Sequence, residues 1–499
     1  MSNTTYQLVA LAIYFAAMIG IGIWAKTKNN NLDDYVLGGR SLSPTAAALS
    51  AGASDMSGWL LMGLPGALYI TGLAEAWIAV GLTIGAWLNW KFVAPRLRSY
   101  TEVSRNSVTV PSFFHNRLRD PYGAIRIFSA VVILIFFTFY VSSGMVAGGV
   151  FFQSTFGGNY HTGMVLVAGI TMLYTLFGGF LGATYTDMVQ GLLMLVALIV
   201  LPIMALFYVG GFSGLETTIE SVNPTALSLF AGTSLLGILS SMAWGLGYFG
   251  QPHIIVRFMG LRTVADARAG RRIGISWMLA TIIGAMSAGL IGIAYFARHP
   301  EAQLTDTKNA ESVFLDMSQY LLHPLLAGFV LAAVLAAIMS TLSSQLVVCS
   351  SALAEDLYKL TSKGKELSAS KGLWLGRGAV LAVALIAAAL AWNPDSSVLS
   401  LVSFAWAGFG AAFGPIVLLC LYWRKLTVAG AVAGMLAGTA TVFIWGYNDT
   451  LSGYMYEIVP GFLINLLVAY LVSIATYKGD SVQAQEINQE FDRAVELTR

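Results

Sequence analysis

Long apolar segments separated by short polar ones recur along the 499 residues of the chain. A helix of about 20 apolar residues is long enough to cross the hydrocarbon core of a bilayer. Thirteen candidate spans lie near residues 6–25, 44–70, 73–94, 126–150, 162–182, 187–209, 230–250, 273–296, 322–352, 377–392, 398–423, 427–447 and 455–477. The pattern predicts an all-α polytopic membrane protein with about thirteen transmembrane helices, surrounded by membrane lipid.

The positions of Lys and Arg orient these spans, because cytoplasmic loops carry an excess of positive charge. If the N-terminus lies outside, 25 of the 27 basic residues fall on the cytoplasmic side and only Arg298 and Lys308 lie outside. One missed or invented span would scramble this separation. We therefore expect a multi-pass protein of the cell inner (cytoplasmic) membrane, with its N-terminus outside and its C-terminus in the cytoplasm. The first span has no small-residue cleavage site, which predicts a retained helix rather than a signal peptide.

The composition fits a membrane domain and narrows the function. Hydrophobic residues make up 57% of the chain and charged residues 10%, which favours a bilayer over a water-soluble core. A net charge of +2 is too small to indicate a nucleic-acid partner. Cys349 and Cys420 lie in apolar segments and give neither a disulfide framework nor a metal-ligand spacing. We expect one transmembrane domain over residues 1–477, with no obligate protein partner.

Residues 478–499 are polar and mildly acidic, and we expect them to form a cytoplasmic tail. Ile487, Phe491 and Val495 recur within it at helical spacing. This spacing favours a short amphipathic helix over a regulatory docking site.

Two spans have the features of interrupted helices. The second combines the run from Ala51 to Trp59, rich in Gly and Ser, with Pro65, and the seventh contains the Gly-rich run from Ser240 to Pro252. A shift of 187 residues lays Pro65 on Pro252. Because the two spans are an odd number apart, they cross the membrane in opposite directions, as the first helices of two inverted repeats must. We expect an inverted five-helix repeat core at about 44–209 and 230–423, with peripheral helices at 6–25, 427–447 and 455–477.

An interrupted helix exposes backbone groups at the middle of the membrane. Its free carbonyls can ligate a cation, and the unpaired N–H groups of the following half-helix can bind a carboxylate. Asp55 lies within the first such span, where a carboxylate is costly. It is either a functional residue or a structural anion that caps the broken helix, and the sequence leaves both readings open. Together these features indicate an ion-coupled transporter.

Three stretches also carry a family resemblance, at 49–66, 244–252 and 405–415. Over about residues 31–477 the chain resembles the sodium:solute symporter family, and within it the bacterial sodium/proline symporters. The resemblance implies two inverted five-helix repeats and sodium-coupled uptake of L-proline by alternating access, with about one sodium ion per proline.

The resemblance also implies a sodium site built from neutral oxygens. These are the carbonyls of Ala53, Met56 and Ala337 and the hydroxyls of Ser340 and Thr341. Neutral oxygens suit a hard monovalent cation that must leave again on the inside. Without the resemblance, the two hydroxyls would more readily be assigned to bonds with their own backbone. Asp55 is expected to support sodium-coupled transport, directly or from outside the ligand set.

For the substrate, the resemblance points to residues at both breaks and on the fourth span. They are Ser57, Gly58, Trp59, Tyr140, Trp244 and Tyr248. Trp244 and Tyr248 lie four residues apart beside a break, and so on one helix face. Such rings can hold a small apolar pyrrolidine while backbone N–H groups bind its carboxylate. Asp187 is a further candidate for coupling or gating, with Arg40 as its expected ion-pair partner.

Three other functions are compatible with a chain of many apolar spans. A sodium symporter for a different small organic solute would have the same fold. A membrane-embedded enzyme would need a nucleophile and base or a metal cluster at midplane depth, whereas the five histidines fall in loops or at span ends. A channel is disfavoured because the spans contain no ring of pore-lining charges. We therefore expect a transporter rather than an enzyme.

Overall fold

The computed structural model describes residues 3–27, 36–300, 304, 307–358, 369–393, 397–479 and 481–498. Within these residues the secondary structure is helical, apart from one parallel bridge between Leu42 and Leu261. The prediction of an all-α protein is confirmed.

Nine helices of the described chain are long and apolar enough to cross a membrane. They are α1 (Asn3–Lys26), the segment Leu73–Val103 that contains α5 (Ala76–Leu88) and α6 (Ala94–Val103), α8 (Ala124–Phe156), the second part of α9 (Gly178–Tyr208), α13 (Asp266–Ala297), the segment Pro324–Leu357 that contains α16 (Pro324–Ser351), α19 (Val398–Tyr422), α20 (Val428–Gly446) and α22 (Ile458–Thr476). Shorter apolar helices occupy Tyr160–Leu176, Leu235–Gly250 and Trp374–Leu390. With the interrupted helix at 44–71, these make thirteen candidate spans, as predicted.

The fifth and sixth spans differ from the prediction at their junction. A polar turn was expected after residue 182, but the helical assignment of α9 runs from Tyr160 to Tyr208. The two spans meet at Gly179, whose backbone leaves the helix with φ 58° and ψ −153°. Glycine adopts a positive φ without the steric cost that a side chain adds. The chain therefore turns at this glycine rather than at the more polar residues that follow it.

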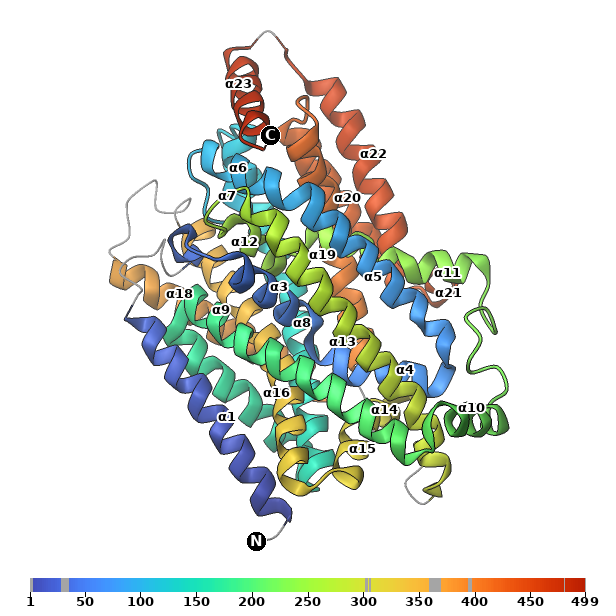
Figure 1. Cartoon of the computed structure of the whole chain (residues 1–499). Coiled ribbons are helices and arrows are strands. Elements are labelled where there is room, and N and C mark those ends of the chain that lie inside the picture. The colour runs from blue at the N-terminus through green and yellow to red at the C-terminus, as the bar shows by residue number, and fades with distance from the viewer. Residues whose placement is uncertain are drawn as a thin grey trace.

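Short helices lie at the ends of the bundle. They are α7 (Val110–Leu118), α10 (Gly211–Val222), α14 (Thr307–Ala310), α15 (Val313–Leu321), α21 (Asp449–Tyr454) and α23 (Val482–Glu496). The C-terminal helix α23 packs on α6 at one end, and the N-terminus of α1 lies at the opposite end (Figure 1).

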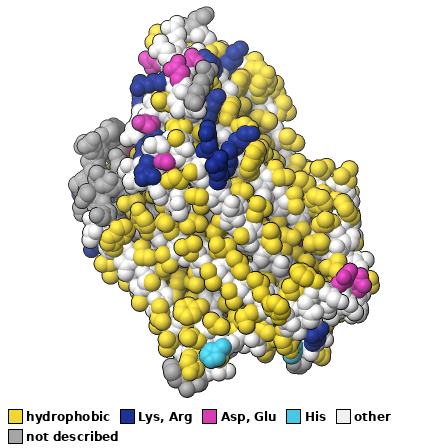
Figure 2. Space-filling model, in the orientation of Figure 1, with side chains coloured by type: hydrophobic (Ala, Val, Ile, Leu, Met, Phe, Trp, Pro, Cys, Tyr) yellow, Lys and Arg dark blue, Asp and Glu magenta, His cyan; other side chains and the backbone are white. Residues whose placement is uncertain are grey.

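Burial separates central from outer helices. In α16 and α19, 83% of the most apolar stretch is buried, against 33% in α1, α20 and α22. The surface of the spans is covered by apolar side chains, whereas Lys and Arg gather at the C-terminal end of the visible face (Figure 2). An apolar belt around many long helices is what a bilayer requires, and the chain is a multi-pass membrane protein.

Close backbone contacts position the seventh span. A Cβ atom added to Gly81 of α5 would lie 2.2 Å from the carbonyl oxygen of Met242, and one added to Gly85 would lie 2.2 Å from that of Gly245. Small residues allow membrane helices to approach this closely. The third span thereby holds the seventh at the point where its helix is interrupted.

Candidate functional site

The second span is interrupted at Ser57. Helix α3 (Pro44–Gly58) begins after the N-cap Ser43 and includes Ser57 at φ 48° and ψ −167°, far from helical values. A π-helical turn follows at Trp59–Gly63, and α4 (Leu64–Thr71) completes the span. The Trp59 N–H donates a hydrogen bond of 3.1 Å to Ser57 Oγ. The predicted break is confirmed.

The seventh span is interrupted over a longer stretch. Helix α11 (Leu235–Met242) passes into 3₁₀ turns at Ala243–Gly250, and Gln251 is extended. Helix α12 (Pro252–Met259) then begins at its proline, which suits a first helical position because it has no N–H to leave unpaired. Gln251 Nε2 donates to the Trp406 carbonyl at 3.1 Å. The break is therefore tied to α19.

Oxygen atoms of α3 and α16 converge just before the first break. Ser340 Oγ donates to the Ala53 carbonyl at 2.7 Å and lies 3.1 Å from the Ala337 carbonyl. Thr341 Oγ1 lies 3.3 Å from the same Ala337 oxygen. Both hydroxyls are buried. Four of the five expected sodium ligands are thus joined by direct contacts, and a set of neutral oxygens suits an alkali cation.

The fifth expected ligand, the Met56 carbonyl, accepts a hydrogen bond from the Trp59 N–H. Asp55 lies between Ala53 and Met56 in the chain. Its carboxylate is directed away from the expected sodium ligands and accepts a short hydrogen bond from the Tyr248 hydroxyl. The Asp55 carbonyl accepts from the Tyr140 hydroxyl at 3.3 Å. Asp55 therefore links the two broken spans.

Aromatic rings close a small cavity beside Asp55. Its lining is Asp55, Met56, Trp59, Leu82, Tyr140, Trp244, Tyr248, Val402 and Trp406. The Trp59 and Trp244 rings are stacked with centroids 6.2 Å apart, and Trp244 also stacks on Tyr456 at 5.2 Å. The cavity measures about 10 Å³, roughly the room that one water molecule needs. The rings are therefore in a closed arrangement.

Four of the six expected substrate residues line this cavity, namely Trp59, Tyr140, Trp244 and Tyr248. Ser57 forms the break itself. Gly58 faces away, because a Cβ atom there would lie 3.1 Å from Ala147 and 3.4 Å from Ile338. Gly58 therefore allows close contact with the neighbouring helices and does not line the cavity.

Two aromatic residues were not identified from the sequence. Trp406 Nε1 donates to the Trp244 carbonyl at 2.7 Å, and its ring meets Tyr248 edge to face. Tyr456 stacks on Trp244 and donates to the Ser403 carbonyl at 2.6 Å. Trp406 lies within the stretch 405–415 that carries the family resemblance, which was the available signal. Tyr456 had none.

The expected pairing of Asp187 with Arg40 is wrong. Asp187 is fully buried and pairs with the buried Arg257 of α12 at 3.2 Å. It also accepts from Ser50 at 2.7 Å and Ser344 at 3.3 Å. Asp187 thus joins α3, α12 and α16 to α9, and Arg257 takes the place that the sequence assigned to Arg40.

Arg40 lies in a turn before α3 and binds elsewhere. It donates to Thr101 at 3.1 Å, Asn106 at 3.0 Å, and the carbonyls of Met259 at 2.7 Å and Ser107 at 2.9 Å. Burial lowers the pKa of Arg40 to about 10, and the neighbouring Arg98 guanidinium acts in the same direction. The side chain therefore keeps its charge near neutral pH and cross-links the loops at this end of the bundle.

His253 also departs from the expectation that the histidines lie in loops or at span ends. It is buried in the first turn of α12, inside the seventh span, and its ring contacts Phe137 and Tyr140. Within the residues that the structure describes, no group of three or more His, Cys, Asp or Glu side chains is placed to hold a metal ion.

Comparison with known proteins identifies the family. The model of the sodium:solute symporter family matches residues 35–438. The chain belongs to this family. It is 52% identical to the high-affinity proline transporter PutP of Bacillus subtilis over 475 residues, covering 95% of this chain and 99% of that one. It is 48% identical to a sodium/proline symporter of Staphylococcus aureus, covering 97% and 95%.

Solved structures share the fold. A Na⁺-coupled sialic acid symporter in a substrate-bound outward-open state superposes with a TM-score of 0.79 at 19% identity, over 94% of this chain and 98% of that one. Mhp1, a nucleobase-cation-symport-1 family transporter in a closed conformation, gives 0.56 at 13% identity, over 91% and 98%. Membership of the family makes the chain a symporter rather than an enzyme, and the predicted fold is confirmed.

Proposed function

We propose that this protein takes up L-proline into the cell together with sodium, one ion per substrate, by alternating access across the cytoplasmic membrane. The N-terminus lies outside and the C-terminus inside. Two relatives at 48% and 52% identity carry names that specify proline. The alternative is sodium symport of another small organic solute.

The arrangement around the first break is the observation that carries the proposal. The Ala53 carbonyl faces α16 and accepts a hydrogen bond from Ser340. The Asp55 and Trp59 side chains line the aromatic cavity instead. Only a few residues around the break at Ser57 therefore separate the proposed cation oxygens from the proposed substrate cavity. An ion that draws the Ala53 and Ser340 oxygens together also fixes the backbone from which Trp59 projects.

The cavity chemistry suits proline. Stacked Trp and Tyr rings offer apolar faces to a pyrrolidine ring, and a few polar groups suffice to orient a small ligand. The Tyr140 and Tyr248 hydroxyls and the Asp55 carboxylate are polar groups on side chains that line the cavity. The closed rings must part to admit a substrate, as gating in alternating access requires. The Tyr248 bond to Asp55 and the stacked Trp59 and Trp244 rings join the two broken spans at the cavity.

Coupling to sodium sets how far uptake can run. One cation moving with a zwitterion is electrogenic, so a potential of about 100 mV contributes roughly 2.3 kcal/mol. A tenfold sodium gradient adds about 1.4 kcal/mol. Together they sustain accumulation of roughly 500-fold at one-to-one stoichiometry.

The test is uptake of labelled proline into proteoliposomes that contain only this protein. We expect accumulation that requires an inward sodium gradient, increases with an inside-negative potential and disappears when both are collapsed. Uptake that is indifferent to both would refute coupling. If labelled proline is not accumulated while another labelled solute is taken up with sodium, the substrate is that solute, and only the sodium-symport part of the proposal holds.

A further inference from the structure

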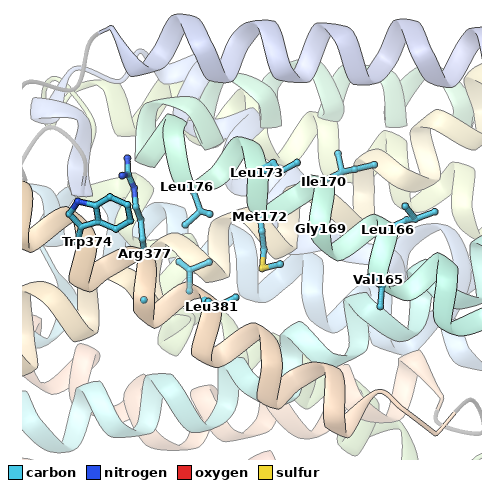
Figure 3. Close-up of a pocket in the computed structure, with 12 residues that line it drawn as sticks. Val165, Leu166, Gly169, Ile170, Met172, Leu173, Leu176, Trp374, Arg377 and Leu381 are labelled. Carbon is cyan, nitrogen blue, oxygen red and sulfur yellow. The ribbon is translucent and has the colours of Figure 1, made fainter.

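A crevice between α9 and α18 (Ala369–Leu390) opens on the outer surface of the bundle (Figure 3). It encloses about 750 Å³, and nearly all of its lining is apolar. Val165 and Leu173 of α9 and Leu381 of α18 are more than half exposed along it. These side chains lie on membrane-spanning helices, so hydrocarbon is the medium that covers them.

The crevice is closed at one end by direct contacts between the two helices. Tyr160 at the start of α9 donates to the Ala391 carbonyl at 2.9 Å. The His161 ring lies 4.5 Å from the Trp392 ring, and His161 Nε2 lies 3.1 Å from the Trp392 carbonyl. From this closed end the crevice, here called the wedge, extends along the two helices to Leu176 and Trp374.

Glycines line the open part of the wedge without any close helix contact. Cβ atoms added to Gly169 of α9 and Gly378 of α18 would meet no atom within 4 Å. Glycines in membrane helices usually serve to bring two backbones together, as Gly81 and Gly85 do in this protein. At Gly169 and Gly378 the space beside the backbone is left for something other than a helix of this chain.

The open end carries charge. Arg377 is half-buried, and its guanidinium lies 5.2 Å from the centre of the Trp374 ring. Figure 3 shows this pair at one end of the crevice and Val165 and Leu166 at the other. Trp and Arg favour the level of the lipid headgroups, and a guanidinium binds phosphate oxygens through two parallel hydrogen bonds. Basic pockets between membrane helices bind acidic headgroups for the same reason.

The apolar wall has the length of a lipid tail. The eleven residue steps from Val165 to Leu176 span about 17 Å along a helix, close to the roughly 15 Å of hydrocarbon in one leaflet. We propose that the wedge between α9 and α18 binds one anionic phospholipid, with an acyl chain against the glycines and the phosphate at Arg377. A helix of a second protein copy, about 10 Å across, fits a wedge closed at one end less well. The inference does not rest on the transported solute.

The ligand would brace a helix next to the sodium oxygens. Besides the wedge, α18 packs on α8 and α16, and Gly376 meets Ser350 of α16. The lipid would therefore cover a side of α18 on which Ala391 and Trp392, just beyond its C-terminal end, are bonded to α9. We expect it to stabilise the transporter without contacting the site.

The test compares lipids on the purified protein. Phosphatidylglycerol should raise the melting temperature by more than phosphatidylcholine with identical chains. The double variant Gly169→Leu and Gly378→Leu fills the wedge from two positions where an added Cβ meets no atom within 4 Å, and it should lose this difference. Arg377→Gln should weaken the apparent affinity for phosphatidylglycerol about fivefold. Gly20→Leu, on the outer face of α1 with equally open surroundings, is the control and should behave as the parent.

A phosphatidylglycerol with a photoreactive group in its acyl chain locates the site in the parent protein. Labelling within residues 165–176 and 374–381 supports the proposal. Labelling spread evenly over the bundle, or a phosphatidylglycerol effect that survives in the double variant, overturns it. Cross-linking of two protein copies through the wedge would assign it to an oligomer instead and would also overturn the proposal.

Discussion

Ser57 separates residues of different chemistry within one short segment. Before it, Ala53 presents a carbonyl oxygen to Ser340 of α16, and after it Trp59 presents a ring to Trp244. A positive φ on a side chain other than glycine is costly and persists where the surroundings impose it. At this position the bond from the Trp59 N–H to Ser57 Oγ helps to hold it. The strained residue is thus the hinge between the proposed ion and substrate contacts.

The proposed sodium ligands can be tested one at a time. We expect Thr341→Val and Ser340→Ala to raise the sodium concentration for half-maximal uptake about tenfold or more, because each variant deprives the charged sodium ion of one oxygen ligand. Maximal proline uptake at saturating sodium should change little. The measurement is the initial rate of uptake against sodium concentration.

Ser351→Ala is the matched control on the same helix, since its hydroxyl bonds back to the Val348 carbonyl at 2.9 Å. Thr341→Ser, which keeps the hydroxyl, should stay close to the parent. Unchanged sodium dependence in Thr341→Val and Ser340→Ala would place the cation elsewhere.

Trp406 offers a test of the aromatic cavity. Trp406→Phe keeps a ring but removes the donor to the buried Trp244 carbonyl, and a buried unpaired group costs about 1–3 kcal/mol. We expect the KM for proline to rise about tenfold while sodium dependence is retained. The same result is expected for Trp244→Ala. Trp423→Phe, at the end of α19 beside Tyr470, is the control. Equal KM values in parent and variant would make Trp406 an ordinary packing residue.

The sequence predicted the residues that carry a local signal and missed those that act through distant contacts. Trp244 and Tyr248 stand beside a Gly- and Pro-marked break, so they could be named in advance. Tyr456 reaches Trp244 from more than 200 positions away, and nothing in its own neighbourhood marks it. Arg257 was counted among cytoplasmic loop charges, but the fold of α12 carries it into the interior beside Asp187.

At the scale of elements, one buried ion pair ties four helices together. Arg257 of α12 contacts Asp187 of α9, Ser50 of α3 and Ser344 of α16, the last at 2.5 Å. These helices include the first broken span and α16, which carries the proposed sodium ligands Ser340 and Thr341. Buried charges are costly to separate but add little net stability as a pair. The cluster therefore specifies how the helices fit together more than how stable they are.

This gives a prediction for the double variant. Asp187→Asn alone should destabilise the protein by about 3–5 kcal/mol, because Arg257 then lacks its counter-charge. Asp187→Asn combined with Arg257→Gln should recover part of that loss. Thermal unfolding of the purified protein measures both. Asp266→Asn, which breaks an exposed pair with Arg262, should cost under about 1 kcal/mol. If the losses in free energy of unfolding of Asp187→Asn and of Arg257→Gln, each alone, add up to the loss of the double variant, the two charges do not interact.

The C-terminal helix is a second element with a defined attachment. The amphipathic pattern predicted it, and α23 places Ile487, Phe491 and Ala494 in the interface. Arg119 pairs with Glu490 at 2.5 Å, Arg424 pairs with Asp492, and Phe491 lies edge to face with Tyr100. The helix thus ties α6 and α7 to the loop between α19 and α20. Sequence spacing gave the helix but not the surface that receives it.

Phe491 is the buried side chain of α23 that contacts Tyr100, and its removal tests the docking of this helix. We expect Phe491→Ala to cost about 3–5 kcal/mol of docking energy and to release α23 while the membrane helices stay intact. Hydrogen exchange over residues 482–498 should accelerate strongly, with α19 and α22 unaffected. Val482→Ala, at a side chain that is 73% exposed, is the control. Protection of α23 that is unchanged in Phe491→Ala would mean that the ion pairs alone hold the helix.

At the scale of the whole molecule, hydrophobic periodicity predicted the helices, and glycine and proline predicted the two breaks. The turn at Gly179 was not predicted because glycines in an apolar run, here Gly178, Gly179 and Gly182, resemble ordinary helix packing. The closed state of the aromatic rings also lay beyond the sequence, since it is one of the conformations that a transporter adopts in turn. The division into repeats at 44–209 and 230–423 stays a prediction.

The orientation of the whole protein can be measured because the native thiols are hidden. Cys349 and Cys420 are fully buried, so a membrane-impermeant maleimide should find no reactive thiol in the folded parent. Thr4→Cys and Leu497→Cys place one exposed thiol near each terminus. With the basic residues inside, Thr4→Cys should be labelled on intact cells and Leu497→Cys only after permeabilisation. The reverse labelling pattern would show that the protein has the opposite orientation in the membrane. Labelling of both on the same side would require an even number of spans and contradict thirteen, whatever solute the protein carries.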